Sequence, residues 1–171
     1  MQIYLLRHAI AETRDPERYP VDADRPLTRE GRNRMARGAR GMRSLGLRFD
    51  LVLTSPLVRA RQTARIVLPV FRPRPPLRAL RPLSPGGGTG GVFAALDAVP
   101  AEAAVLLVGH EPDLARLAGA MTLEPRGDLA LEFKKGGLCR IDFEGSARPG
   151  HGRLVFLLTP KVLRRLAPRS R

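Results

Sequence analysis

Three short and almost uninterrupted apolar runs occur along the chain, at residues 2–6, 51–53 and 103–108. A strand that is covered on both faces carries apolar side chains at successive positions, instead of alternating apolar and polar ones. We therefore predict that these runs are strands buried in the middle of a sheet.

Between and after these runs, apolar residues recur at every third or fourth position, which is typical of the buried face of an amphipathic helix. Three such stripes follow Thr28, Ser55-Pro56 and Pro112, respectively. Thr28 and Ser55 are suitable N-caps, and proline is favoured at the first helical position. The stripes consist of Met35, Ala39, Met42 and Leu45, of Leu57, Ala60, Ala64 and Val67, and of Leu114, Leu117 and Met121.

The remaining segments complete the expected architecture. Residues 138–143 and 154–158 predict two more strands, whereas residues 72–91 are rich in proline and glycine and predict an irregular connection. The alternation of strands and helices favours an α/β fold, a three-layer sandwich with a mainly parallel central sheet flanked by helices. We expect one domain over residues 1–160, followed by a basic, frayed C-terminal tail over residues 161–171.

Composition narrows the class of protein. The 171 residues suit a single domain, and 43% of them are apolar, which is enough for an ordinary core. The N-terminal apolar run is short and lacks a preceding basic region, so we expect no signal peptide, and no apolar run is long enough for a membrane span. Cys139 is the only cysteine and excludes an intrachain disulfide. We expect a cytoplasmic monomer that does not bind a membrane.

The net charge is +14, and arginine supplies nearly all of it, because Lys134, Lys135 and Lys161 are the only lysines. Such a field attracts anions and suits a nucleic acid or an acidic protein partner. Alternatively, it reflects a compositional preference for arginine, with the charges solvated over the surface. The chain has no RNA-binding signature and no zinc-finger spacing, and only 5% of its residues are aromatic, which argues against nucleic acid as the partner.

Candidate chemistry follows the three predicted buried strands. The carboxyl ends of parallel strands meet at one edge of a sheet, where ligands bind. Helix N-termini and arginine forks suit phosphoryl oxygens, and a neutral imidazole is a competent nucleophile. His151, the third histidine, lies in a glycine-rich turn and is expected at the surface. The candidate residues are Arg7 and His8 after the first strand, Ser55 and Arg59 after the second, and His110 and Glu111 after the third.

The order of these motifs resembles the histidine phosphatase superfamily. The resemblance rests on LLRHA at residues 5–9, SPLVRARQT at residues 55–63 and VGHEP at residues 108–112. DRPLT at residues 24–28, followed by Gly31, is similar to the SixA-like phosphohistidine phosphatases in particular. The resemblance spans about residues 1–121 and implies a histidine phosphatase, or phosphoglycerate mutase-like, fold.

The resemblance also implies a role for each motif residue. His8 attacks phosphorus and becomes transiently phosphorylated, and water then releases inorganic phosphate. Arg7 and Arg59 hold the phosphoryl oxygens, and His110, cationic in the loaded site, stabilises the transition state. Ser55 and Arg25 are further candidates for binding substrate. No cofactor is implied, and we expect no metal, because two arginines repel a cation and acidic ligands at a suitable spacing are lacking.

One departure from the family concerns the proton donor. Many members carry a carboxylic acid between the second and third motifs, but residues 51–96 contain no Asp or Glu. Either another carboxyl group supplies the proton, or the leaving group needs none. The candidates are Glu111, which we place first because it adjoins His110, and then Asp113, Asp24 and Glu12. An imidazole, whose conjugate acid has a pKa of about 6.5, leaves far more readily than an alkoxide.

These observations favour a metal-independent phosphatase that acts on protein phosphohistidine. The connection at residues 72–91 is too short for a long helical lid, so a protein-borne group can reach the site. Arginines near the motifs, Arg25 among them, could then meet an acidic protein surface. Two alternatives remain: a small-molecule phosphomonoesterase of the same superfamily, and a non-enzymatic basic module that binds polyanions.

Overall fold

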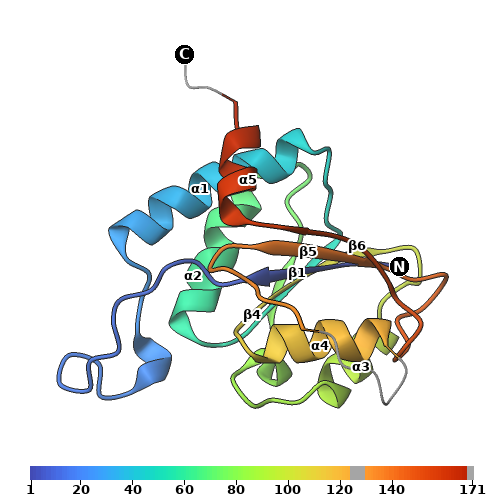
Figure 1. The fold of residues 1–171 in the computed structure, drawn as a ribbon, viewed down its shortest axis with the longest axis horizontal. Helices are drawn as coiled ribbons and strands as arrows, with labels where there is room; N and C mark the ends of the chain where they lie inside the picture. The colour runs from blue at the N-terminus through green and yellow to red at the C-terminus, as the bar shows by residue number, and fades with distance from the viewer. Residues whose placement is uncertain (124–129, 169–171) are drawn as a thin grey trace.

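The computed structural model describes residues 1–123 and 130–168, and a six-stranded mixed sheet forms its centre (Figure 1). The strand order is β3-β2-β4-β1-β5-β6. The strands are β1 (Gln2–Arg7), β2 (Leu51–Thr54), β3 (Leu77–Ala79), β4 (Ala104–Gly109), β5 (Leu138–Asp142) and β6 (Arg153–Leu158). The helices are α1 (Arg29–Ser44), α2 (Val58–Val67), α3 (Gly90–Asp97), α4 (Asp113–Thr122) and α5 (Pro160–Leu166), with short 3₁₀ turns at Asp22–Asp24, Leu68–Val70 and Arg81–Leu83.

The expected α/β sandwich is confirmed. Strands β1, β4, β2 and β3 are parallel, whereas β5 and β6 extend the sheet in the antiparallel sense beyond β1. Helices α1, α2 and α5 lie on one side of the sheet, and α3 and α4 lie on the other (Figure 1). Arg7 pairs with Gly109, and Thr54 pairs with Val108, so the three central strands end side by side.

The sheet separates two apolar cores, which explains why the central strands are apolar at successive positions. Tyr4 and Leu6 of β1 point into the core beneath α1 and α2, while Ile3 and Leu5 point into the core shared with α3 and α4. All of these side chains are buried. Cys139 of β5 is buried as well, and burial raises the pKa of its thiol to about 12, so the thiol stays protonated.

The helix starts were predicted with mixed success. Thr28 caps α1 as expected, because its Oγ1 accepts a hydrogen bond of 2.8 Å from the Gly31 amide. Helix α2, however, begins at Val58 and not at Pro56, with Leu57 in the cap position. Pro112 occupies the cap position of α4.

Two segments correct the sequence-based expectations. The stretch 72–91 is not wholly irregular, because it contains β3 and a 3₁₀ turn, and α3 starts at Gly90. The predicted tail is also not a frayed end over residues 161–166, which belong to α5. Leu163 of α5 is fully buried against α1, where Gly41 lets the two helices approach closely. Residues 169–171 of the predicted tail lie outside the described residues.

None of the helices in the described ranges is both long and apolar enough to cross a membrane. His151 is exposed in the turn before β6, as expected, and its Nδ1 lies 2.7 Å from the carbonyl oxygen of Pro149.

Candidate active site

The ends of three neighbouring elements bring the predicted residues together. His8 follows β1 and His110 follows β4, and the His8 amide donates a 3.0 Å hydrogen bond to the carbonyl of Gly109. The ring centroids of His8 and His110 are consequently 5.0 Å apart. Arg59 comes from the first turn of α2, and Arg7 is the last residue of β1. His8, Arg59 and His110 are all buried, with exposed fractions of 7%, 4% and 3%.

The imidazole of His8 is held in one tautomer. Its Nδ1 lies 2.7 Å from the carbonyl oxygen of Ala9, which can only accept, so Nδ1 carries the hydrogen and Nε2 carries the lone pair. Burial, aided by the charges of His110, Arg59 and Arg7, lowers the pKa of His8 to about 3 although the bond to Ala9 opposes the change. The ring is therefore neutral at pH 7, as a nucleophile must be.

Each arginine is anchored at one end of its guanidinium group. Arg7 Nη1 donates to the carbonyl of Phe133 at 2.5 Å. Arg59 Nη1 donates to the backbone carbonyl of Asp22 at 2.9 Å, and its Nη2 lies 3.1 Å from the Asp22 carboxylate. The Nε atoms of Arg7 and Arg59 are buried and have no hydrogen-bond partner in the described part of the chain.

His110 is oriented by Ser55. His110 Nε2 lies 2.8 Å from Ser55 Oγ, which also accepts the Leu57 amide at 3.3 Å. Because the Ser55 oxygen accepts the Leu57 amide, its hydroxyl hydrogen can be donated to His110 Nε2. This bond favours the His110 tautomer that carries its hydrogen on Nδ1. Burial, followed by the charge of Arg59, lowers the pKa of His110 to about 4. Ser55, expected to bind substrate, thus contacts His110.

Three buried nitrogens around the paired imidazoles lack a partner within the described residues: Arg7 Nε, Arg59 Nε and His110 Nδ1. Buried polar atoms in folded proteins are nearly always hydrogen-bonded, so such a group indicates a ligand. Two guanidinium donors and one imidazole donor suit an anion with several acceptor oxygens, such as a phosphoryl group.

Gln62 and Thr63, at the end of the second motif, connect the site to neighbouring segments. Gln62 Oε1 accepts the Leu27 amide at 2.7 Å, which holds the segment before α1 against α2. Thr63 Oγ1 accepts the Ala9 amide at 3.0 Å and donates to the Arg59 carbonyl at 2.7 Å. Thr63 therefore ties the backbone beside His8 to the helix that carries Arg59.

Asp22 is a site residue that the sequence did not reveal. Its carboxylate contacts Arg59 and also lies 2.9 Å from Arg25 Nε, while Arg25 Nη1 donates to the Glu12 carbonyl at 2.7 Å. Partial burial opposes ionisation of Asp22, but Arg25 and Arg59 outweigh it and lower the pKa of the carboxyl group. Arg25 thus reaches the site through Asp22, and no spacing in the sequence distinguishes Asp22 from Asp24.

Glu111 contacts a backbone segment beside the site. Its Oε1 accepts the Phe133 amide at 2.9 Å, and the Phe133 carbonyl in turn accepts Arg7 Nη1. Asp113, another candidate donor, accepts the Gly86 amide at 3.0 Å. The role of Glu111 as proton donor stays a prediction.

Within the described residues, no group of three or more His, Cys, Asp or Glu side chains is placed to hold a metal ion. The guanidinium groups of Arg59, which is buried, and Arg7, which is half-buried, give the pocket fixed positive charge, which favours an anion and opposes a cation there.

Comparison with known proteins identifies similar chains. Residues 3–81 match the model of the histidine phosphatase superfamily (branch 1). An uncharacterized protein of Picosynechococcus sp. is 38% identical over 169 residues, covering 95% of this chain and 99% of that one. The protein histidine phosphatase SixA, solved in complex with tungstate, superposes with a TM-score of 0.82 at 26% identity, over 95% of this chain and 99% of SixA. A putative phosphohistidine phosphatase SixA from Agrobacterium tumefaciens is 27% identical, with a TM-score of 0.72 over 93% and 97% of the two chains.

Proposed function

The chain belongs to the histidine phosphatase superfamily, and from this premise we propose that it dephosphorylates phosphohistidine in proteins through a covalent intermediate on His8. The observation that carries the proposal is the tautomer of His8, whose Nδ1 bond to Ala9 leaves the Nε2 lone pair beside three nitrogen donors that have no partner in the described ranges. The solved SixA structures, to which this chain is similar, are described as protein histidine phosphatase and putative phosphohistidine phosphatase, which supports the same substrate class.

The proposed reaction has two displacements at phosphorus. In the first, the Nε2 lone pair of His8 attacks, an N–P bond forms, and the bond from phosphorus to the leaving imidazole breaks. In the second, water attacks phosphorus, the N–P bond to His8 breaks, and inorganic phosphate is released. Arg7, Arg59 and the Nδ1 hydrogen of His110 stabilise the charge on the equatorial oxygens in both steps.

The carboxylates beside the site are already engaged, which bears on the leaving group. Asp22 holds Arg59, and Glu111 holds the Phe133 amide. Residues 51–96 contain no carboxylate at all. An imidazole leaving group needs little protonation, since its conjugate acid has a pKa of about 6.5, whereas an alkoxide depends on a general acid. This arrangement supports phosphohistidine over a sugar phosphate.

The test is a substrate panel measured with EDTA present. The panel contains a phosphohistidine peptide, a sugar phosphate and a nucleotide monophosphate, and the readouts are phosphate release and acid-labile phosphoenzyme. We expect the peptide to be turned over fastest and His8→Ala to lose more than about a thousandfold in rate with no phosphoenzyme. His151→Ala, which removes an exposed histidine, is the matched control and should behave as wild type.

Each contrary result has a distinct meaning. Faster turnover of the sugar or nucleotide phosphate would make the chain a small-molecule phosphomonoesterase. Retention of activity by His8→Ala would refute the nucleophile. Tight binding of nucleic acid or polyphosphate, steeply dependent on salt and without turnover, would identify a polyanion-binding module instead.

A further inference from the structure

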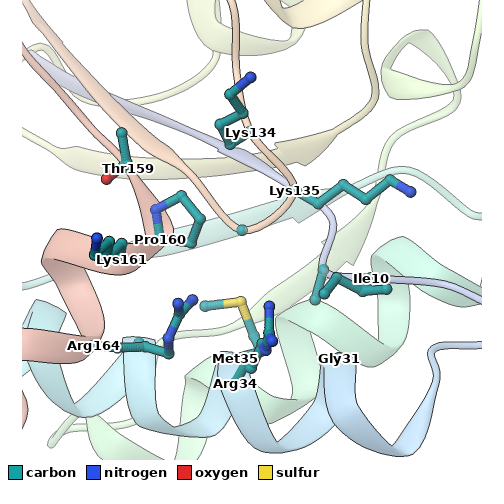
Figure 2. Close-up of a pocket in the computed structure, with 13 residues that line it drawn as sticks. Ile10, Gly31, Arg34, Met35, Lys134, Lys135, Thr159, Pro160, Lys161 and Arg164 are labelled. Carbon is teal, nitrogen blue, oxygen red and sulfur yellow. The ribbon is translucent and has the colours of Figure 1, made fainter.

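A cavity of about 310 Å³ lies beside His8, between α1, the start of α5 and residues 134–136 (Figure 2). Ala9 and Ile10, which directly follow His8, form another part of its wall. Leu6 of β1 pairs with Leu138, and Leu138 pairs with Leu158. Residues 134–136 and the start of α5 therefore lie at the edge of the sheet where β1 ends, and the cavity lies there with them.

The wall at residues 134–136 adjoins the backbone groups that hold Arg7. The Phe133 carbonyl accepts Arg7 Nη1, and the Gly136 amide donates to the Arg7 carbonyl at 3.1 Å. Lys134, Lys135 and Gly136 then line the cavity. A molecule seated in the cavity is therefore next to the residues that hold His8 and Arg7.

The rim of the cavity is cationic. Five cationic residues and, among the described residues, no acidic one line it, although the Lys134 ammonium points away from Met35 and Arg164 in Figure 2. Arg34 is paired with Glu30, and Lys134 is paired with Glu132, and neither acidic residue lines the cavity. Lys135, Lys161 and Arg164 make no ion pair within the described ranges. The five are Arg34, Lys134, Lys135, Lys161 and Arg164.

Arg164 lies close to other cationic groups at this rim. Burial, followed by the charges of Arg34 and Arg37, lowers the pKa of Arg164, although Glu30 opposes the change. The chain uses arginine almost everywhere, yet all three of its lysines lie on this one cavity. A compositional preference for arginine does not account for that placement.

The floor of the cavity is apolar. Met35 and Pro160 face it, and the thioether of Met35 lies between Arg34 and Arg164 in Figure 2. Gly31, Gly38 and Gly136 contribute no side chains, so the floor is accessible to a ligand. No aromatic side chain is among the described lining residues, so the cavity offers nothing on which a nucleobase can stack.

We propose that this cavity docks an acidic segment of the substrate protein, with one apolar side chain on the floor and carboxylates at the rim beside Lys135, Lys161 and Arg164. Charge complementarity favours such a segment, and the apolar floor favours a polypeptide over a polynucleotide. This inference rests on the proposed function and deepens it, because docking here holds a protein-borne phosphohistidine near His8.

The binding experiment uses an unphosphorylated fluorescent peptide in which aspartates and glutamates surround one leucine. We expect anisotropy to show binding that weakens as salt rises, since exposed charges are screened. The double variant K135E/K161E should bind about tenfold more weakly, because like charges then face each other. R148E/R153E, which makes the same charge change at exposed arginines near the opposite edge of the sheet, should bind as wild type.

The kinetic experiment separates docking from chemistry. We expect K135E/K161E to raise KM for a phosphohistidine peptide with the same acidic flank about tenfold, with little change in kcat. Turnover of phosphoramidate, which carries no acidic flank and no apolar side chain, should stay within about twofold of wild type. Replacement of the leucine by serine in the peptide should weaken binding by about tenfold, which tests the floor without altering the protein.

Four results would overturn the proposal. They are unchanged peptide binding in K135E/K161E, an equal loss in R148E/R153E, a parallel loss of phosphoramidate turnover, and displacement of the peptide by an oligonucleotide of equal charge. A thermal unfolding midpoint equal to that of wild type checks that each variant is folded. If the wild type binds the acidic peptide but hydrolyses only small esters, both the proposed function and the docking role are wrong. If it hydrolyses phosphohistidine but the variants leave peptide binding unchanged, only the docking role is wrong.

Discussion

Arg7, Arg59 and His110 have one feature in common: part of each side chain is fixed, and one buried nitrogen of each has no hydrogen-bond partner among the described residues. The Phe133 carbonyl fixes Arg7, Asp22 fixes Arg59 and Ser55 fixes His110. His8 is fixed in the same way by the Ala9 carbonyl. Side chains that are oriented before substrate arrives need no rearrangement during the reaction, which is the main advantage of a preformed site.

Glu111→Gln distinguishes a proton donor from a positioning residue. The amide oxygen of glutamine can still accept the Phe133 N–H, so we expect kcat on a phosphohistidine peptide to stay within about threefold of wild type. A general acid would instead contribute about 10²- to 10⁴-fold, together with the alkaline limb of the pH profile. Glu111→Ala removes the acceptor of the Phe133 amide and should raise KM, because the Phe133 carbonyl holds Arg7. A large loss of kcat in Glu111→Gln would instead establish Glu111 as the proton donor.

Asp22→Asn tests whether Arg59 depends on its carboxylate partner. The substitution keeps the shape of the side chain but removes the charge that faces Arg59 and Arg25. A hydrogen bond between charged groups contributes about 1.5–3 kcal/mol, so we expect kcat/KM to fall by about tenfold or more. Asp24→Asn is the neighbouring control and should change kcat/KM little. Equal effects of the two substitutions would remove Asp22 from the site.

At the scale of elements, the sequence predicted what the apolar pattern encodes. The buried strands and the first amphipathic helix were visible because their side chains face a core. Strand β3 was missed because only Leu77 of its three residues is partly buried, at the edge of the sheet. Helix α3 begins with two glycines, which have poor helix propensity, and the arginines and lysine of α5 concealed the buried Leu163.

In the candidate site, too, some residues could be predicted from the sequence and others could not. Arg7, His8, Arg59 and His110 were predicted together because each follows a strand end or begins a helix. The partners that orient them include the backbone carbonyls of Ala9 and Phe133, which carry no side-chain signature. Contacts of that kind depend on how distant segments pack, and they become visible only in the folded chain.

Two glycines of α1 make a paired test of how the helix positions the site. A Cβ at Gly31 would lie 2.0 Å from the Ile10 carbonyl oxygen, and one at Gly41 would lie 1.8 Å from the Leu163 carbonyl oxygen. Alanine in a helix is normally about 1 kcal/mol more favourable than glycine, so destabilisation would report the clash.

We expect both Gly31→Ala and Gly41→Ala to lower the unfolding midpoint, by displacing different neighbours. Only Gly31→Ala should also lower kcat, because the backbone at Ile10 continues directly from His8. The measurements are thermal unfolding and turnover of phosphoramidate. A stabilised Gly31→Ala variant with full activity would contradict the close approach.

At the scale of the whole molecule, the buried histidines make stability depend on pH. In the unfolded chain they bind protons near a pKa of about 6.5, whereas the folded pKa values are about 3 for His8 and about 4 for His110. Between these values the unfolded state binds more protons, so stability falls as pH falls. The loss should approach 1.4 kcal/mol per pH unit for each histidine, that is, about one tenfold change in the folding equilibrium.

Urea unfolding of the protein without phosphate between pH 7 and pH 5 measures this dependence. The double variant H8N/H110N should lose less stability over that interval than wild type, whereas His151→Asn, at an exposed position, should follow wild type. Equal slopes for all three proteins would show that the two histidines are not held neutral by the fold.

The placement of the lysines has a practical consequence. Lys134, Lys135 and Lys161 carry the only side-chain amines of the chain, and all of them line the cavity beside His8. An acylating reagent that spares guanidinium groups will therefore label side chains at this cavity alone. Protection of Lys135 or Lys161 from labelling, measured by mass spectrometry, would then report occupancy of the cavity without any engineered probe.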